Sequence, residues 1–420
     1  MSFKKVCVLG LGYIGLPTAA LMASRGIRVV GVDIRQAVVD SVNRGEVHLV
    51  EPLLDAVVQA AVGSGRLTAA PRPETADAFM IAVPTPITAN KASDMRAVLS
   101  AVDAIAPVLK AGDLVVLEST SPVGSTDRIA QRLAAARPDL RFPGAGTSGA
   151  ADVNVAYCPE RVLPGKIIEE LVSNDRAIGG MTSQCTQRAI DLYALFVDGE
   201  LVPTRAREAE LCKLAENAFR DVNIAYANEL ANVCDGQGVD VWEVIRLANR
   251  HPRVNILSPG PGVGGHCIAV DPWFIVESAP HDTPVIQAAR AVNDGRPDRV
   301  VNRIRVAAEG LSSPIVACLG LAFKPDIDDL RESPAVDVAM NLAALADFTV
   351  LAVEPNIQEL PARIGEAGVE LVDLETALSR ADLVVLLVDH KIFKDSAARI
   401  AQGGRVIDTR GILPRPAAVQ

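Results

Sequence analysis

The chain has 420 residues, too many for one hydrophobic core, so we expect two or three domains of about 100–200 residues each. Hydrophobic residues make up 49% of the chain and charged residues 22%, a composition typical of globular proteins. The formal net charge of −10 disfavours nucleic acid and anionic membranes as general partners, because both would be repelled.

Short apolar runs alternate with helical patterns through the first part of the chain, which is typical of βαβ units around a parallel sheet. Strands are predicted at Lys5–Leu9, Arg28–Val32, Phe79–Val83, Leu114–Leu117 and Asn154–Tyr157. Helices are predicted at Gly15–Arg25 and near Met95–Leu109, and a loop rich in Gly and Pro at 134–152. The uncharged run 6–24 also has the length of a membrane-spanning helix, but its glycines and Pro17 favour a strand, a turn and a helix.

A different pattern begins near Arg205. Apolar residues recur at helical spacing from Ala209 to about Cys234, and because other faces are apolar too, we expect a buried central helix that joins two domains. After Ser312 the alternation returns, with strands at Ile315–Leu319, Thr349–Val353, Leu383–Val388 and Arg405–Asp408 and a helix at Ser333–Leu345. The chain is therefore predicted to be an α/β protein with parallel-sheet domains at 1–204 and 312–420 and a helical region at 205–311.

The seven cysteines are dispersed, with no CxxC pair and no Cys/His spacing typical of zinc, so the sequence predicts no metal site. An odd number of scattered cysteines in a long chain is typical of a reduced compartment, and we expect a cytoplasmic protein.

The segment VCVLGLGYIGLPTAA predicts a dinucleotide site. Gly10, Gly12 and Gly15 form a GxGxxG pattern between the first strand and the first helix. Such glycines allow a tight turn, close approach of a pyrophosphate and packing of helix on strand, and the helix N-terminus attracts the phosphates. Asp33 ends the second strand, where a carboxylate accepts the ribose hydroxyls of NAD and repels the 2′-phosphate of NADP. Arg35 weakens this preference, but NAD is the expected cofactor.

A reactive cysteine is predicted in the segment PGPGVGGHCIAVD. Cys267 follows an irregular loop rich in glycine, where a buried, inert cysteine is less expected than in a strand. Asp271 lies four residues later, and it reaches the same face if the segment is helical. A carboxylate there can position or activate a water molecule.

The predicted central helix carries two pairs of side chains at i,i+4 spacing in ELCKLAENAFRDVN. Lys213 and Asn217 project together and can face a developing oxyanion. Glu216 and Arg220 have the same spacing and predict a surface ion pair.

Polar residues also follow predicted strands. Glu160 lies in YCPERVLPGK, and residues 118–120 (Glu, Ser, Thr) end another strand, at the edge of a parallel sheet where ligands bind. Lys324 and Arg331 lie in GLAFKPDIDDLRESP, a strand-to-helix connection suited to a diphosphate or a cofactor.

The motifs GLGYIGLPTA, VPTP, STSPVGST, YCPERVLPG, CKLAENAFRDVNIAYANE, GPGVGGHC and FKPDIDDLRESPA occur in the order typical of one family. The chain resembles the UDP-glucose/GDP-mannose dehydrogenase family from end to end. The resemblance implies an NAD-binding Rossmann-like domain (1–204), a helical dimerisation region with the catalytic cysteine (205–311) and a Rossmann-like UDP-sugar-binding domain (312–420). It also implies a four-electron oxidation of the sugar's C6 hydroxymethyl group to a carboxylate, through a thiohemiacetal and a thioester on Cys267.

The resemblance also implies the roles of single residues. The catalytic residues are Cys267, Lys213, Asn217, Asp271, Glu160 and Thr120. The cofactor-binding residues are Gly10, Gly12, Tyr13, Ile14, Gly15, Asp33, Arg35, Pro84, Thr85, Thr120 and Arg331. The substrate-binding residues are Glu160, Arg161, Val162, Lys213, Asn217, Arg253, Gly262 and Lys324, with Arg253 supplied by the other subunit of a homodimer.

The chain departs from the UDP-glucose members ahead of the cysteine. Those members usually carry a GFGGSC-like run, whereas this chain has GVGGHC with His266 in place of the serine. This favours a 2-acetamido sugar but does not decide between mannosamine and glucosamine. The segments PERVLPGKIIEELVSNDRAIGG, RLANRHPRVNIL and GVGGHCIAVDPWFIV most resemble the family members that act on UDP-N-acetyl-D-mannosamine. The resemblance therefore implies this substrate and a product used in surface polysaccharides. UDP-N-acetylglucosamine and UDP-glucose stay open as alternatives.

Two rival classes of function are weighed against this reading. A β-hydroxyacid dehydrogenase shares a dinucleotide domain and a helix lysine, but it needs neither Cys267 nor a second α/β domain. A non-catalytic sensor of NAD or nucleotide sugars has no need of a nucleophile.

Overall fold

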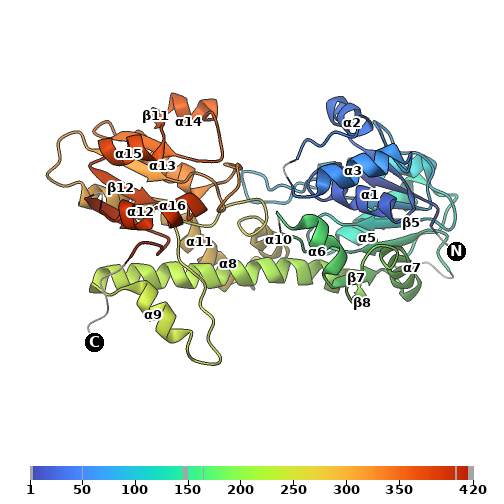
Figure 1. Cartoon of the computed structure of the whole chain (residues 1–420). Helices are drawn as coiled ribbons and strands as arrows, with labels where there is room; N and C mark the ends of the chain where they lie inside the picture. The colour runs from blue at the N-terminus through green and yellow to red at the C-terminus, as the bar shows by residue number, and fades with distance from the viewer. Residues whose placement is uncertain (1–2, 50, 145–149, 164, 403, 415–420) are drawn as a thin grey trace. The chain divides into compact units, whose positions relative to one another are not determined.

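The computed structural model describes residues 3–49, 51–144, 150–163, 165–402 and 404–414 (Figure 1). The chain divides into two compact units. The first unit comprises Met1–Glu216 and Trp273–Ala279, and the second comprises Asn217–Pro272 and Pro280–Gln420. Each unit is built around one sheet, so the predicted α/β class with two sheets is confirmed.

The sheet of the first unit has eight strands. In spatial order they are β3 (Leu67–Ala70), β2 (Arg28–Val32), β1 (Lys5–Leu9), β4 (Ala78–Ile81), β5 (Leu114–Leu117), β6 (Asn154–Tyr157), β7 (Arg176–Gly180) and β8 (Leu201–Arg205). All neighbours are parallel except β6 and β7, which run antiparallel, so this part of the sheet differs from the expected parallel arrangement.

Both faces of this sheet are buried. Val6 and Val8 of β1 pack into one hydrophobic core, whereas Cys7 and Leu9 pack into another on the opposite face. Alternate residues of a strand point to opposite faces, so a strand buried on both sides is a continuous apolar run. The helices of the unit are α1 (Gly15–Ser24), α2 (Gln36–Asn43), α3 (Leu54–Gly63), α4 (Arg96–Ile105), α5 (Ser125–Ala136), α6 (Ile167–Ser173) and α7 (Ser183–Tyr193), with a 3-10 turn at Ala106–Val108.

The sheet of the second unit has five parallel strands and repeats the same two-sided burial. In spatial order they are β11 (Val369–Leu371), β10 (Thr349–Val353), β9 (Ile315–Leu319), β12 (Leu383–Leu386) and β13 (Arg405–Asp408). The helices are α9 (Val241–Ala248), α11 (Pro284–Asp294), α12 (Arg296–Ala307), α13 (Pro334–Ala343), α14 (Ala362–Glu366), α15 (Leu374–Arg380), α16 (Lys391–Asp395) and α17 (Ala397–Ile400), and α10 (Asp271–Ser278) begins in this unit.

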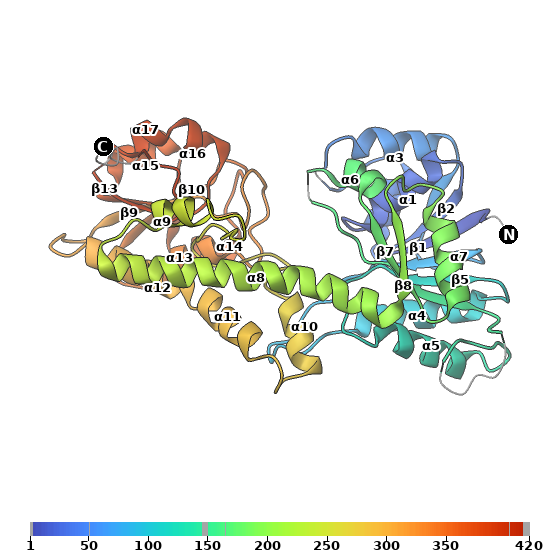
Figure 2. The same cartoon turned by 90° about the horizontal axis from the view of Figure 1, so that it is seen from below.

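The long helix α8 runs from Ala206 to Gln237 and contributes residues to both units (Figures 1 and 2). In the second unit, α9 folds back along α8, and Ala227 and Ala231 pack against Val241 and Ile245. The prediction that α8 is buried holds for one face of the helix and is wrong for the other. Four large apolar side chains on α8 are exposed, by 45–68% of their area, at positions 211, 219, 226 and 233.

Some predicted bounds shift. Helix α5 extends to Ala136, three residues into the predicted loop 134–152, of which 145–149 lie outside the described residues. In the described part of the chain, no helix is long and apolar enough to cross a membrane.

Candidate functional site

The candidate residues fall in both units. In the first unit, the glycine turn after β1 has the geometry of a dinucleotide cradle. Gly10 has a φ of +94°, and a Cβ at Gly15 would lie 1.8 Å from the Gly10 carbonyl oxygen. Both positions therefore need glycine for the fold. A Cβ at Gly12 would meet no heavy atom within 4 Å, so the turn leaves open space there, where a pyrophosphate fits.

Asp33 is fixed at the end of β2 with its carboxylate beside this turn. It accepts hydrogen bonds from the Leu11 amide (3.2 Å) and from the Arg35 amide (2.9 Å) and side chain (3.2 Å). Burial opposes ionisation, but these hydrogen bonds outweigh it and hold the pKa of Asp33 below its usual range. Arg35 is thus engaged with Asp33, and the carboxylate is charged, as ribose binding requires.

Ile34 was not singled out by the sequence reasoning. Its side chain is 94% exposed, although it lies between Asp33 and Arg35, directly after the buried strand β2. An exposed isoleucine next to the ribose-binding acid is a suitable apolar contact for an adenine ring. The signal was its position directly after Asp33, not its residue type.

The loops after β4 and β5 are tied together. The Thr85 hydroxyl donates to the Thr120 carbonyl oxygen (2.5 Å), and the Ser119 hydroxyl donates to that of Val83 (2.6 Å). Pro84 is exposed and Thr85 and Thr120 are half-buried. Near the glycine turn, Tyr13 is exposed and Ile14 half-buried.

Glu118, at the end of β5, points into the unit. It is buried and accepts a hydrogen bond from the Tyr193 hydroxyl (2.6 Å), while its Oε2 has no hydrogen-bond partner among the described residues. Burial raises the pKa of Glu118 to about 7. Sequence reasoning placed Glu118 at this edge but not its burial.

Lys213 is buried and pairs with the half-buried Glu160. The Lys213 ammonium donates to the Glu160 carbonyl oxygen (2.7 Å) and carboxylate (3.2 Å), and the Val162 amide donates to the other carboxylate oxygen (2.9 Å). Arg161 forms an ion pair with Glu216 (2.6 Å). The predicted ion pair between Glu216 and Arg220 was therefore wrong, since Glu216 turns to the β6–α6 loop instead.

In the second unit, Asn217, Asp271 and Cys267 are brought together. The Asn217 side-chain amide donates to the Asp271 carboxylate (2.6 Å), and both residues are buried. The Asp271 amide donates to the Cys267 carbonyl oxygen (2.8 Å), the i,i+4 bond of a helical turn. Cys267 is exposed and forms no disulfide. A carboxylate held one turn from an accessible thiol is a suitable arrangement for covalent catalysis.

The loop ahead of Cys267 needs its glycines. A Cβ at Gly264 would lie 2.3 Å from the Glu332 carbonyl oxygen, and Gly265 has a φ of +82°. Gly262 has a φ of +148°, and a Cβ there would lie 2.7 Å from Pro334. The loop is therefore pressed against the segment before α13, with the Gly265 amide donating to Glu332 (3.2 Å).

Three residues that are predicted to bind substrate or cofactor lie on loops of the second unit. Lys324 is half-buried and Arg331 exposed in the connection between β9 and α13, and Arg331 is paired with Asp329 (2.6 Å). Arg253 is exposed on the loop after α9. Among the described residues, no cluster of His, Cys, Asp and Glu could hold a metal ion.

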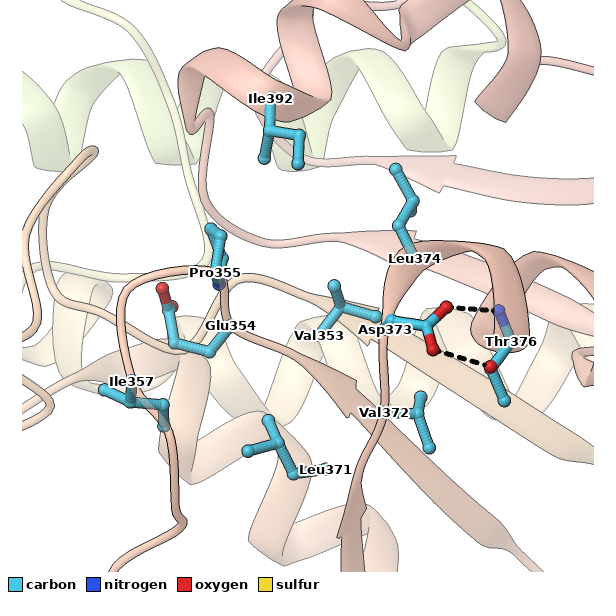
Figure 3. Close-up of a pocket in the computed structure, with 10 residues that line it drawn as sticks. All are labelled: Val353, Glu354, Pro355, Ile357, Leu371, Val372, Asp373, Leu374, Thr376 and Ile392. Atoms are coloured by element: carbon cyan, nitrogen blue, oxygen red, sulfur yellow. Dashed lines mark hydrogen bonds between the residues drawn. The ribbon is translucent and has the colours of Figure 1, made fainter.

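A cavity of about 540 Å³ lies elsewhere in the second unit, over the ends of β10 and β11 (Figure 3). Its lining is mainly apolar, and none of the predicted site residues contributes to it. Asp373, in its wall, caps α15 through Thr376. The cavity is therefore separate from the candidate chemistry.

Comparison with known proteins identifies the family. Three domains described for the UDP-glucose/GDP-mannose dehydrogenase family match this chain: the NAD binding domain at residues 4–197, the central domain at 207–295 and the UDP binding domain at 317–415.

Several relatives match over nearly the whole chain. An "NDP-N-acetyl-D-galactosaminuronic acid dehydrogenase" from Ralstonia nicotianae is 57% identical, covering 98% of this chain and 97% of the relative. A "UDP-N-acetyl-D-mannosamine dehydrogenase" from Yersinia pestis is also 57% identical, covering 98% and 100%.

Solved structures agree. A UDP-D-ManNAc dehydrogenase from Pyrococcus horikoshii is 38% identical with a TM-score of 0.88, covering 98% of this chain and 96% of that chain. A UDP-N-acetyl-mannosamine dehydrogenase from Staphylococcus aureus is 40% identical with a TM-score of 0.84 and the same coverage. The chain therefore belongs to the UDP-glucose/GDP-mannose dehydrogenase family, whose members include NAD-dependent UDP-sugar dehydrogenases.

Proposed function

We propose that this chain oxidises UDP-N-acetyl-D-mannosamine to UDP-N-acetyl-D-mannosaminuronate in two NAD-dependent steps, for use in surface polysaccharides. The chemistry is supported by one observation above all: Asn217 holds the Asp271 carboxylate one helical turn from the accessible Cys267. The substrate is supported by relatives of that name at 55–57% identity over 98% of the chain.

The residues of the first unit fit an NAD site, because Gly12 faces open space and Asp33 carries a charged carboxylate beside it. NAD, when bound, accepts one hydride from C6 of the sugar in each of two oxidation steps. Ile34, Pro84, Thr85 and Thr120 contact the cofactor in this proposal.

The proposed reaction begins with the alcohol. A water held by Asp271, or Lys213 in its neutral amine form, takes the proton of the C6 hydroxyl as the first hydride leaves. The Cys267 thiolate then attacks the aldehyde carbon, and Lys213 and Asn217 donate to the resulting oxyanion. Loss of the second hydride from this thiohemiacetal leaves a thioester on Cys267.

Hydrolysis completes the proposed reaction. A water positioned by Asp271, with Glu160 and Thr120, attacks the thioester, the Cys267 thiolate leaves, and the sugar is released as a carboxylate. One alcohol and one water thus consume two NAD and yield two NADH. The covalent link keeps the half-oxidised sugar bound while the first NADH is exchanged for NAD.

The substrate is proposed to lie against residues of both groups. Glu160, Arg161 and Val162 contact the sugar, the cysteine loop at Gly262 contacts the nucleotide, and Lys324 binds the diphosphate. Arg331 is assigned to the cofactor. The matched NAD binding, central and UDP binding domains support a division into regions at 1–204, 205–311 and 312–420. In this proposal the middle region forms the dimer.

We further propose a homodimer through α8. Leu211, Phe219, Tyr226 and Val233 are exposed on this helix and separated by eight, seven and seven residues. Such spacing keeps side chains on one helix face, and an apolar stripe of this kind is typical of a helix that pairs with another copy. Arg253, exposed on the loop after α9, would then reach the partner's substrate.

The seven cysteines form no disulfide, which supports a cytoplasmic location.

The substrate is tested by NADH release with UDP-N-acetylmannosamine, UDP-N-acetylglucosamine, UDP-N-acetylgalactosamine and UDP-glucose in parallel. We expect the highest kcat/KM with UDP-N-acetylmannosamine. A preference for the galacto sugar would favour the activity named in the Ralstonia relative, which is equally similar to this chain. A preference for glucose would overturn the assignment to 2-acetamido sugars.

A further inference from the structure

The second unit repeats the turn that forms the dinucleotide cradle of the first. After β9, Gly320 has a φ of +89° and its amide donates to the Val353 carbonyl oxygen (2.8 Å). The next amide, of Leu321, donates to the carboxylate of Glu354 at the end of β10 (2.8 Å). Glu354 thus occupies the position that Asp33 holds in the first unit, where the acid is proposed to bind the ribose of NAD.

The carboxylate of Glu354 is fully used inside the protein. One oxygen accepts from the amides of Leu321 (2.8 Å) and Ala322 (3.0 Å) and lies 3.0 Å from His390 Nε2. The other accepts from the amide (3.2 Å) and side chain (3.1 Å) of Asn356. Burial opposes ionisation, but the bonds from His390 and the amides outweigh it and hold the pKa of Glu354 below its usual range. Since a carboxylate offers about four acceptor sites, none is left for a ribose.

His390 forms a hydrogen bond with the other end of the same loop, at Asp326. It is completely buried, and its Nδ1 lies 2.9 Å from the Asp326 amide. Because an amide N–H can only donate, Nδ1 is the acceptor, and the ring proton lies on Nε2 and is donated to Glu354. The Asp326 side chain in turn accepts from the Lys391 amide (2.8 Å), and Asp326 has a left-handed φ of +60°. The segment 321–326 is therefore fixed at both ends by one buried pair.

Two residues of this segment connect it to the proposed site. Lys324, the proposed ligand of the diphosphate, lies between the two fixed ends. Phe323 packs against the cysteine loop, where a Cβ added to Gly265 would lie 2.9 Å from its ring. Gly265 is two residues before Cys267, so the position of this segment sets the surface on which the cysteine loop rests.

We infer that Glu354 and His390 are positioning residues that hold the segment 321–326, and with it Lys324, in the conformation that binds the diphosphate of the UDP-sugar. In the second unit, the acid at the end of β10 does not face a ligand. Its hydrogen bonds, together with those of His390, fix the conformation of the loop after β9. This inference rests on the proposed function, because Lys324 is assigned to the diphosphate there.

The test is calorimetric titration of the full-length protein with UDP, and separately with NAD, together with thermal unfolding of each variant. His390→Ala removes all three hydrogen bonds of the ring, those with Asp326, Asn356 and Glu354. His390→Asn keeps an acceptor near the Nδ1 position and so restores the bond from Asp326 but not the one to Glu354. Asp373→Ala is the matched control, because it removes a helix cap in the same cavity wall and destabilises the same unit without touching the segment (Figure 3).

We expect UDP to bind about tenfold more weakly to His390→Ala, because the backbone amide of Asp326 loses its partner and no longer fixes the end of the segment. The dissociation constant for NAD stays unchanged, His390→Asn recovers part of the loss, and Asp373→Ala binds UDP like the wild type. In turnover, the KM for the UDP-sugar rises more than kcat falls. Glu354→Gln is expected to weaken UDP binding in the same way.

Three results would overturn the inference. In the first, folded His390→Ala and Glu354→Gln bind UDP as tightly as the wild type. In the second, Asp373→Ala weakens UDP binding as much as His390→Ala, which would reduce the pair to general stability. In the third, the wild type itself does not bind UDP, which would overturn the proposed function as well.

Discussion

At the scale of single residues, the proposed catalytic side chains owe their arrangement to contacts that no local pattern specifies. Asn217 and Asp271 are 54 residues apart in the sequence and meet through one hydrogen bond. The helical spacing predicted that Asn217 projects beside Lys213, but the partner of Asn217, Asp271, begins α10, and the partner of Lys213, Glu160, lies on the loop after β6. Residue types and motifs could indicate the participants, whereas the pairing depends on the tertiary fold.

Glu118 illustrates what sequence cannot give. Its place at a strand end was predictable, but whether such a carboxyl faces ligand or core depends on Tyr193, which lies 75 residues later. Burial raises the pKa of Glu118 to about 7. The native state therefore keeps the proton between the unfolded pKa, roughly 4.3, and about 7.

The protonation of Glu118 predicts how the free energy of unfolding depends on pH. Because the folded state binds more protons than the unfolded state in that interval, the contribution of Glu118 to stability is present below about pH 4 and is lost as the pH rises through about 7. In Glu118→Gln, which can still accept from Tyr193, this loss disappears. We expect the variant to gain on the order of 1–3 kcal/mol relative to the wild type between pH 5 and pH 8. Thermal unfolding at the two pH values measures it, and an equal difference at both would contradict the assignment.

At the scale of elements, most of the strands that were predicted are buried on both faces, and the partly exposed edge strand β13 is an exception. Strand β5, Leu114–Leu117, is apolar throughout, and each residue enters one of the two cores. The strands β3, β7, β8 and β11 were not predicted. Strand β8 is exposed at the sheet edge and contains Pro203, and β7 reads Arg-Ala-Ile-Gly-Gly, so neither has a strand-like pattern. Sheet pairing, not composition, makes them strands.

The glycine turn after β1 gives a prediction at this scale. Gly12→Ala adds a methyl group into open space, so stability should change by less than about 1 kcal/mol, while the methyl group fills the space proposed for the pyrophosphate. We expect NAD to bind at least about tenfold more weakly. Gly63→Ala, another glycine with no neighbour within 4 Å, serves as the control that leaves NAD binding unchanged. Unchanged NAD affinity in Gly12→Ala would place the cofactor elsewhere.

At the scale of the whole molecule, α8 is the least typical element. This helix of 32 residues exposes a regular stripe of apolar side chains that its own chain leaves uncovered. In the proposed dimer, a second copy of the chain covers the stripe. Sequence periodicity predicted the helix but not which face stays exposed, because that depends on where α9 and the other helices of the second unit pack.

Subunit mixing tests the proposed role of Arg253. Arg253→Ala and Cys267→Ser are each expected to be inactive as homodimers. If Arg253 acts on the partner's substrate, a mixed dimer contains one site with both an intact Cys267 and an arginine from the other subunit. Activity should then appear when the two variants are unfolded, mixed and refolded together. If mixing restores nothing although mixed dimers form, Arg253 acts within its own subunit.

The measurement that tests the central claim most directly is the amount of NADH formed per UDP-N-acetylmannosamine consumed, for the wild type and Cys267→Ser. The account predicts two NADH and one uronate per sugar for the wild type. It predicts that the variant forms uronate at least about 100-fold more slowly, because the acyl intermediate lacks its thiolate. One NADH per sugar, or a variant that forms uronate at the rate of the wild type, would contradict covalent four-electron oxidation through Cys267.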